Sequence, residues 1–195
     1  LTSPAKQFMQ PPLLTDPPLE LMLQTDLDEV LLTSGSVQAL LQSPWSAWGQ
    51  CWLNALGESL PPASGYEMTL LLTDNAKIQS FNSQFRHQDQ PTDVLAFAAL
   101  EGSLPRSPLT DVAIDVFPWS NEPLYLGDIV ISLEQAAQQA NERGHDFFIE
   151  VIWLFSHGLL HLLGWDHPDE TTLTTMLSKQ SYLLTLIDLN PPNFI

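Results

Sequence analysis

The chain has 195 residues, of which 44% are hydrophobic and 15% are charged; this composition predicts one globular domain and excludes wholesale disorder. Six Lys and Arg residues against 23 Asp and Glu residues give a formal net charge of -17, so most of the exterior should repel polyphosphates and anionic lipid. The single cysteine, Cys51, excludes an internal disulfide and favours a reducing, cytoplasmic location.

The N-terminal segment 1–18 contains five prolines and has no basic start followed by a continuous apolar stretch. This pattern predicts a flexible tail, not a signal peptide. The longest apolar stretch, 147–163, is interrupted by polar residues and falls short of the ~20 apolar residues of a membrane span. We therefore expect a buried helix there, no membrane association, and a single domain over residues 19–190.

Strand and helix patterns alternate through the first half of the chain. Short apolar or alternating runs predict strands over 19–26, 66–73 and 92–98. Apolar residues at helical spacing predict one or two helices over 37–56, broken near Pro44. A short helix that Asp74 caps should extend to about Ser83, after which the chain turns before the third strand.

The second half begins with a proline-rich excursion at 99–123, in which we expect at most one short edge strand. A strand follows over 125–131. Ser132 and Gln135 have the spacing of a capping box and should open a helix that ends at Gly144. We expect two further helices, one from Asp146 to Gly164 and one over 171–189. This order predicts an α+β fold, one mixed sheet packed against helices, with the helix near 147–163 at its centre.

Three of the five histidines lie within eleven residues, at His157, His161 and His167. The first two are four residues apart, so on a helix their imidazoles occupy one face. Gly164 permits a left-handed turn that returns His167 toward them. Three nitrogen ligands leave a coordination position for water, as in catalytic metal sites. Imidazole also suits Cu²⁺, Ni²⁺ and Fe²⁺, but zinc is the default expectation, at one Zn²⁺ per chain.

The histidine spacing matches the metzincin protease motif H-E-x-x-H-x-x-G-x-x-H, except that Gly158 replaces the glutamate that acts as general base. The stretch 157–167 more closely resembles the YbeY family of rRNA-maturation endoribonucleases, whose signature H-G-x-L-H-L-x-G-Y/W-D-H it matches without a gap. Two further stretches are similar to that family. Residues 81–97 resemble its N-x-x-Y/F-R…D-x-P-T-D-V-L-S-F motif, with Ala96 in place of serine, and 126–132 resemble L-G-D-I-V-I-S.

The resemblance covers about residues 66 to 170 and implies an α+β fold with a zincin-like site. It implies a zinc ion on His157, His161 and His167, and cleavage of single-stranded RNA in ribosomal RNA maturation and ribosome quality control. The implied partners are ribosomal RNA or its precursors, with the ribosome or assembly factors. It also implies that Arg86 is a functional cation near the metal, a role that suits a guanidinium because it can hold a phosphate bidentately.

Other polar residues have a structural and a functional interpretation. Arg86 could instead pair with Asp89 or Asp93 at the surface. Asp166 could orient a histidine, accept a proton, or simply belong to the turn after the helix; we expect a role beside the metal. We expect Asp93 and Asp128 to brace strand ends and Glu150 to be a solvated or capping charge. His87 and His145 have no partner at a recognisable spacing, and the core is expected to contain Trp45, Trp48, Trp52 and Trp153.

Two alternatives to a zinc-dependent endoribonuclease remain from the sequence. One is a metallohydrolase with another substrate, although Gly158 disfavours peptide hydrolysis. The other is a non-enzymatic ribosome-assembly factor in which the metal only braces the fold, an interpretation that the absence of an obvious general base and the acidic composition keep open.

Overall fold

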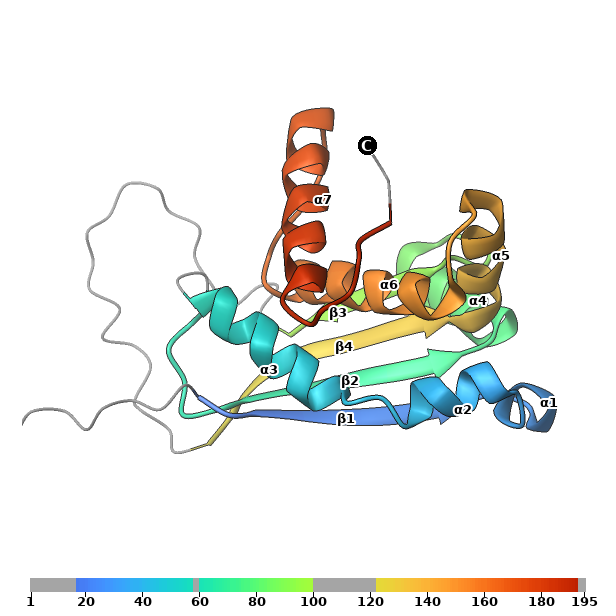
Figure 1. Ribbon diagram of the computed structural model, residues 1–195, viewed down its shortest axis with the longest axis horizontal. Coiled ribbons are helices and arrows are strands. Elements are labelled where there is room, and N and C mark those ends of the chain that lie inside the picture. Colours follow the sequence, from blue (N-terminus) through green and yellow to red (C-terminus); the bar gives the residue numbers. More distant parts are fainter. Residues whose placement is uncertain (1–16, 58–59, 100–121, 193–195) are drawn as a thin grey trace, which may run out of the picture.

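The computed structural model of the chain describes residues 17–57, 60–99 and 122–192. Its four-stranded sheet has the order β1-β2-β4-β3. Strands β1 (Leu19–Asp26), β2 (Tyr66–Thr73) and β4 (Leu124–Ser132) are parallel, and β3 (Val94–Ala98) runs antiparallel along β4 at one edge (Figure 1). The predicted mixed sheet and α+β class are confirmed. Strand β3 begins two residues later than predicted, because the Asp93 carboxylate caps its start by accepting from the Val94 backbone N–H at 2.8 Å.

All of the predicted helices are present. The helices of the described residues are α1 (Glu29–Leu32), α2 (Gly35–Leu41), α3 (Trp45–Ala55), α4 (Asn75–Arg86), α5 (Leu133–Arg143), α6 (Phe147–Leu162) and α7 (Glu170–Thr185). The predicted caps Asp74, Ser132 and Asp146 each accept a backbone N–H in the first helical turn, which satisfies a donor that the helix itself cannot.

One helix was not predicted, and α4 and α7 end three or more residues from their predicted ends. Helix α1 was not predicted, because it is a single turn that buries no residue and so leaves no apolar periodicity. Helix α4 continues past Ser83 to Arg86; the Phe81 and Phe85 rings both pack near Phe97 and extend its apolar face. Helix α7 ends at Thr185, four residues before the predicted end, and the chain then turns.

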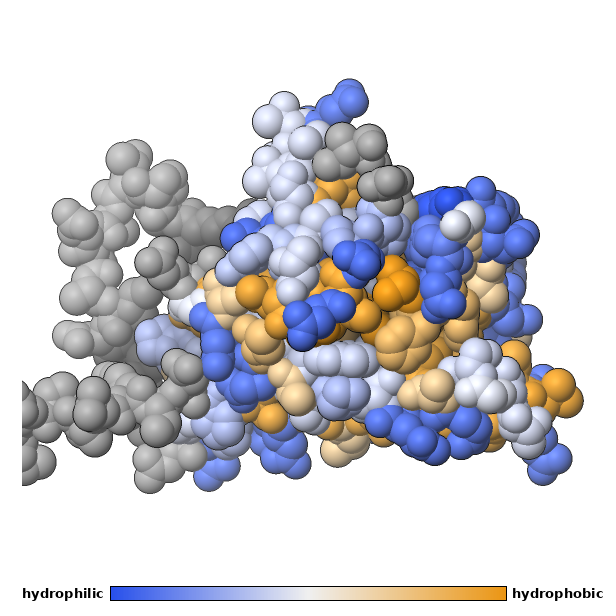
Figure 2. All heavy atoms as spheres, viewed as in Figure 1, coloured by the Kyte–Doolittle hydropathy of each residue, from blue (hydrophilic) through white to orange (hydrophobic). Residues whose placement is uncertain are grey.

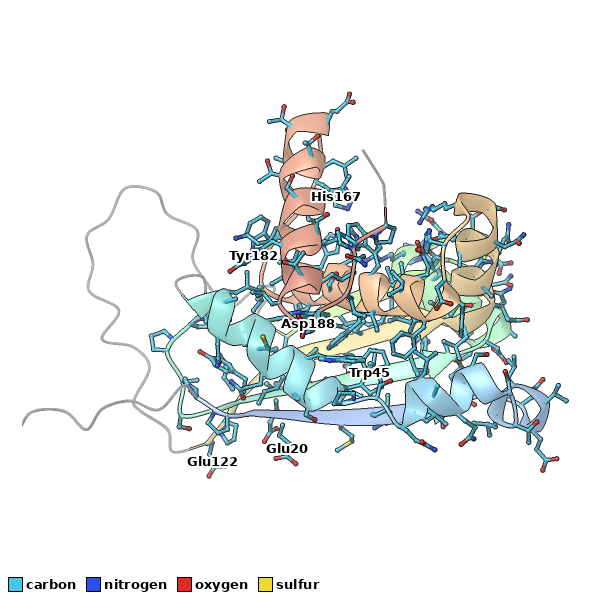
Figure 3. The ribbon with its side chains drawn as sticks, viewed as in Figure 1. Glu20, Trp45, Glu122, His167, Tyr182 and Asp188 are labelled. Carbon is cyan, nitrogen blue, oxygen red and sulfur yellow. The ribbon has the colours of Figure 1, made fainter. Side chains whose placement is uncertain are left out.

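The two faces of the sheet carry different helices. Helices α3 and α6 cover one face, where side chains of β2 and β4 form the main core with Trp45, Trp52 and Phe155 (Figures 1 and 3). Helix α4 packs on the opposite face through Ile78, which meets Leu95 and Val130 in a smaller cluster. The alternation of side chains along each strand produces this division. Figure 2 shows apolar residues gathered in the middle of the first face, with hydrophilic residues around them.

Helix α6 is the central element that was predicted. It contacts β3, β4, α5 and α7, and burial on so many sides explains why its sequence is nearly continuously apolar. Helix α7 stands away from the sheet over the C-terminal end of α6 (Figure 1). This arrangement holds the end of α6, which carries two of the predicted metal ligands, on a rigid support.

Most of the predicted tail and excursion, residues 1–16 and 100–121, lie outside the described residues. None of the helices in the described ranges is both long and apolar enough to cross a membrane. We propose that residues 19–190 form one domain, because the elements from β1 to α7 share one core.

Candidate metal centre

The structure brings the three predicted histidines together. His157 and His161 lie one turn apart near the end of α6. Gly164 follows with φ +82°, the left-handed conformation that was expected of it, and the chain turns so that the ring centroid of His167 lies 5.3 Å from that of His157 (Figure 3). One ring nitrogen from each histidine lies within 4.8 Å of the others. This separation allows the three imidazoles to bind one ion.

Hydrogen bonds fix the orientation of two of the rings. The Nδ1 atom of His161 lies 2.8 Å from the Trp165 carbonyl oxygen, and Nδ1 of His157 lies 3.1 Å from Oε1 of Gln180. Because these oxygens can only accept, both Nδ1 atoms carry the proton in the neutral rings. The Nε2 atoms of His157 and His161 then direct their lone pairs toward each other across 3.0 Å.

This geometry fits a metal ion. Burial lowers the pKa of His157, and burial together with the neighbouring histidines lowers the pKa of His161 to about 4. The two rings are therefore neutral at pH 7, and their facing lone pairs repel unless a cation lies between them. Nitrogens bound tetrahedrally to one zinc ion at about 2.0–2.1 Å would be about 3.3 Å apart, close to the separation of the two Nε2 atoms. The three histidines can thus hold a metal.

Gln180 is a site residue that sequence reasoning missed. It is fully buried in α7, and its Nε2 donates to the Trp153 carbonyl at 3.3 Å, which leaves Oε1 for His157. The signal available in the sequence was a polar residue on the apolar face of the helix, between Met176 and Leu183, both of which are buried. A buried amide at such a position needs partners, and one of them is the metal-site imidazole.

A cavity of about 520 Å³ adjoins the histidines. Its walls come from the ends of α4 and α6, from β3 and from the turn after α6, with the residues Arg86, Thr92, Asp93, Val94, Ala96, His157, His161, Gly164, Trp165, Asp166 and His167. The structure therefore places both predicted catalytic residues, Arg86 and Asp166, at the same cavity as the predicted metal ligands.

Arg86 reaches the cavity from the far face of the sheet, because α4 ends beside the edge strand β3. The turn after Arg86 is held by Asn82, whose buried side chain donates to the Gln90 carbonyl at 2.8 Å. Neither alternative partner pairs with Arg86. Asp89 accepts a hydrogen bond from Gln79, and Asp93 accepts from the Val94 backbone and from Gln139. No carboxylate in the described part of the chain lies within ion-pair distance of the exposed Arg86 guanidinium.

The acidic residues near the site have distinct contacts. The Asp166 carboxylate accepts from the His167 backbone N–H at 2.8 Å and so braces the turn that presents this histidine. Asp93 braces the start of β3 and also accepts from Gln139 at 2.9 Å. Asp128 accepts from the Tyr125 hydroxyl. The structural role expected of Asp93 is confirmed. Asp128 does not brace a strand end as expected, because it lies in the middle of β4 and contacts Tyr125 of the same strand.

The expectation of a solvated or capping Glu150 is wrong. Glu150 is fully buried, and its two carboxylate oxygens meet Arg143, at 2.8 Å, and His145. His145 therefore does have a partner, which its spacing did not indicate because the pair forms across the turn between α5 and α6. Burial raises the pKa of Glu150, and the two basic partners oppose that rise. The cluster fastens the start of α6 to the end of α5.

The structure explains why position 158 is a glycine. A Cβ atom there would lie 2.7 Å from Cγ2 of Ile129, which is fully buried in β4. Because a β-branched side chain on a central strand cannot easily yield, position 158 faces the sheet with no room for a side chain. The glutamate of the protease motif therefore cannot be placed here without displacing β4.

We expect Gly158→Ala to lower the free energy of unfolding by about 1–2 kcal/mol. Overpacking costs about 1–3 kcal/mol, which exceeds the gain of up to about 1 kcal/mol in helix propensity. Urea denaturation of both proteins measures the difference. Gly35→Ala is a matched control, since its Cβ would have no atom within 4 Å; it should leave stability unchanged or raise it. Equal stability of Gly158→Ala and wild type would contradict the close contact with Ile129.

Comparison with known proteins gives consistent matches. The sequence model of the family described as Endoribonuclease YbeY matches residues 34–188. A relative from Synechocystis sp. named Endoribonuclease YbeY is 60% identical over 176 residues, which cover 90% of this chain and 94% of the relative. One of the same name from Trichormus variabilis is 46% identical and covers 85% of this chain and 96% of the relative. The solution structure of a Thermotoga maritima protein is 23% identical with a TM-score of 0.46, covering 85% of this chain and 89% of that one.

Proposed function

The chain belongs to the YbeY family of endoribonucleases, and from this premise we propose that it cleaves single-stranded RNA with a zinc ion held by His157, His161 and His167. It is accordingly a hydrolase that acts on phosphodiester bonds of RNA. Its proposed substrates are ribosomal RNA or its precursors, in ribosomal RNA maturation and ribosome quality control, with the ribosome or assembly factors as partners in the cytoplasm.

One observation carries the proposed chemistry: three convergent imidazoles line one cavity with a guanidinium that has no carboxylate partner among the described residues. A zinc ion, when bound, supplies Lewis-acid polarisation of a phosphate oxygen and lowers the pKa of a water molecule. His157 and His161 would hold the ion through Nε2, because Gln180 and the Trp165 carbonyl fix their protons on Nδ1.

We assign two further residues to the reaction. The Arg86 guanidinium would bind two phosphate oxygens and stabilise the negative charge that develops on them during cleavage. Asp166 would hold the turn that carries His167, through the backbone hydrogen bond at 2.8 Å, and its other carboxylate oxygen would be available to orient a water molecule or accept a proton. No glutamate at position 158 is needed for either role.

The proposed function predicts that cleavage depends on the bound metal. Purified zinc-loaded protein should cleave a labelled single-stranded RNA and leave the same sequence intact in a duplex. Removing the zinc with a chelator should reduce the cleavage rate at least 100-fold, and adding zinc back should restore it. Metal analysis by mass spectrometry should give about one zinc per chain in the active protein. Undiminished cleavage by metal-free protein would refute the metal-dependent assignment and leave the histidines a structural role.

A further inference from the structure

The few lysines and arginines of this acidic chain differ in whether a carboxylate lies beside them. Four of its six Lys and Arg residues lie in the described ranges. Lys77 and Arg143 are neutralised by Asp26 and Glu150, at 2.9 and 2.8 Å. The other two are Arg86 and Lys179, and no carboxylate of the described residues lies within ion-pair distance of either.

Lys179 makes cation-π contacts with two aromatic rings, one of which lines the cavity of the metal centre. Its Nζ is 5.9 Å from the ring centroid of Trp165 and 5.6 Å from that of Tyr182. Trp165 lines the cavity of the histidines and Arg86. Tyr182 is 47% exposed and projects from α7 one turn after Lys179 (Figure 3). A cation and two partly exposed aromatic rings thus extend from the cavity onto the surface of α7.

We propose that Trp165, Lys179 and Tyr182 form a nucleotide-binding subsite for single-stranded RNA beside the metal centre. A base adjacent to the cleaved phosphate stacks on an exposed aromatic ring, and Lys179 binds a neighbouring phosphate. Stacking of this kind accepts any base, because every base has a π-face. The inference rests on the proposed function, and it supplies what that function lacks: a local cationic and aromatic surface on a chain of net charge -17.

A second aromatic cluster helps to define the subsite by contrast. Phe85 is 55% exposed, and its ring centroid lies 5.1 Å from that of Phe97 on the α4 face of the sheet. A cation-π pair in this cluster is formed by Lys77, whose Nζ lies 5.5 Å from the ring centroid of Phe81, but Asp26 forms an ion pair with that lysine. None of these phenylalanines lines the cavity. Because Trp165 lines the cavity and these phenylalanines do not, position favours the surface on α7 as the site for RNA.

A purely structural role is the competing explanation. Lys179 could simply hold the turn containing Trp165 against α7 through its two cation-π contacts, each worth about 0.5–1 kcal/mol at an exposed site. That role would change stability and metal content but not RNA affinity at full metal occupancy. The two explanations therefore differ in a property that can be measured directly.

The test compares Lys179→Gln and Tyr182→Leu with wild type and with Lys77→Gln. The last is a matched control, because it removes the same charge from another cation-π pair, on α4. Each zinc-loaded protein is titrated against a labelled single-stranded RNA under single-turnover conditions, at several salt concentrations. We expect the half-saturating concentration to rise about 3- to 10-fold for Lys179→Gln, with a salt slope smaller by about one, and about 5- to 30-fold for Tyr182→Leu. The control should stay within 2-fold.

Equal half-saturating concentrations for wild type and both α7 variants, at equal metal content, would overturn the subsite and leave the proposed function standing. Ultraviolet cross-linking with RNA that contains 5-iodouridine tests the contact without requiring cleavage. The adduct should map to the peptides that contain Trp165 or Tyr182. An adduct confined to Phe85 or Phe97 would move the RNA to the other aromatic cluster and refute the proposal. Cross-linking at Tyr182 by a protein that cleaves no RNA would support the subsite while the proposed function fails.

Discussion

Replacing His161 with alanine is expected to empty the metal centre and to reduce RNA cleavage by at least 1000-fold. His161 supplies one of the three converging nitrogens, and its Nε2 lies 3.0 Å from Nε2 of His157. Two imidazoles, one of them on a turn, are a poor site for a divalent ion that prefers four ligands. Metal analysis by mass spectrometry and a cleavage assay on the same sample measure the two losses together.

His87→Asn is a suitable control for the loss of a histidine. His87 ends α4 with φ +58°, and asparagine tolerates that left-handed conformation, so the fold and the metal should be retained. Circular dichroism should show that His161→Ala also keeps its helices, since the ring is only partly buried and the core does not depend on it. Full metal occupancy in His161→Ala would mean that the ion is bound elsewhere.

The second large effect concerns the guanidinium. Arg86→Lys keeps the positive charge but loses the planar pair of donors that matches two phosphate oxygens. Losing one preorganised donor to a developing negative charge typically costs about 100- to 1000-fold in rate. We therefore expect cleavage by Arg86→Lys to fall by about 100-fold or more, with metal content and stability near those of wild type, because Arg86 is exposed and unpaired within the described residues.

Asp166→Asn provides the comparison for this result. Its backbone hydrogen bond to His167 can be made by an amide oxygen as well, so we expect a smaller loss, about 10- to 100-fold, as is typical when a residue that supports a metal ligand is replaced. Both variants are assayed on one single-stranded RNA at equal metal occupancy. Near-normal cleavage by Arg86→Lys beside an inactive Asp166→Asn would instead identify the aspartate as the essential base.

The metal ligands could be predicted from the sequence because their geometry is local. A four-residue spacing on one helix and a glycine turn bring His157, His161 and His167 together with little help from the rest of the fold. The four strands were predictable for a similar reason, since short apolar runs between turn signals define them. These features need only the periodicity of the backbone.

Contacts between distant elements could not be predicted in this way. Gln180 contacts His157 only because α7 folds back over the end of α6. The two residues are 23 apart in the sequence, a separation from which no contact can be predicted. We expected Glu150 to be solvated because an acidic residue in the first turn of a helix is usually exposed to solvent. The turn between α5 and α6 instead buries it against Arg143 and His145. The family resemblance drew attention to Arg86, but its approach around the edge strand depends on the packing of α4.

The hydrogen bond between Gln180 and His157 couples two equilibria: the docking of α7 on the rest of the fold, and the binding of the ion at the metal centre. By linkage, the factor by which the ion tightens the docking of this helix equals the factor by which docking tightens the ion. A ligand that stabilises the docked position of α7 would therefore raise the affinity of the centre for the metal, and one that favours the undocked helix would lower it. The position of the C-terminal helix is in this sense coupled to the chemistry at the C-terminal end of α6.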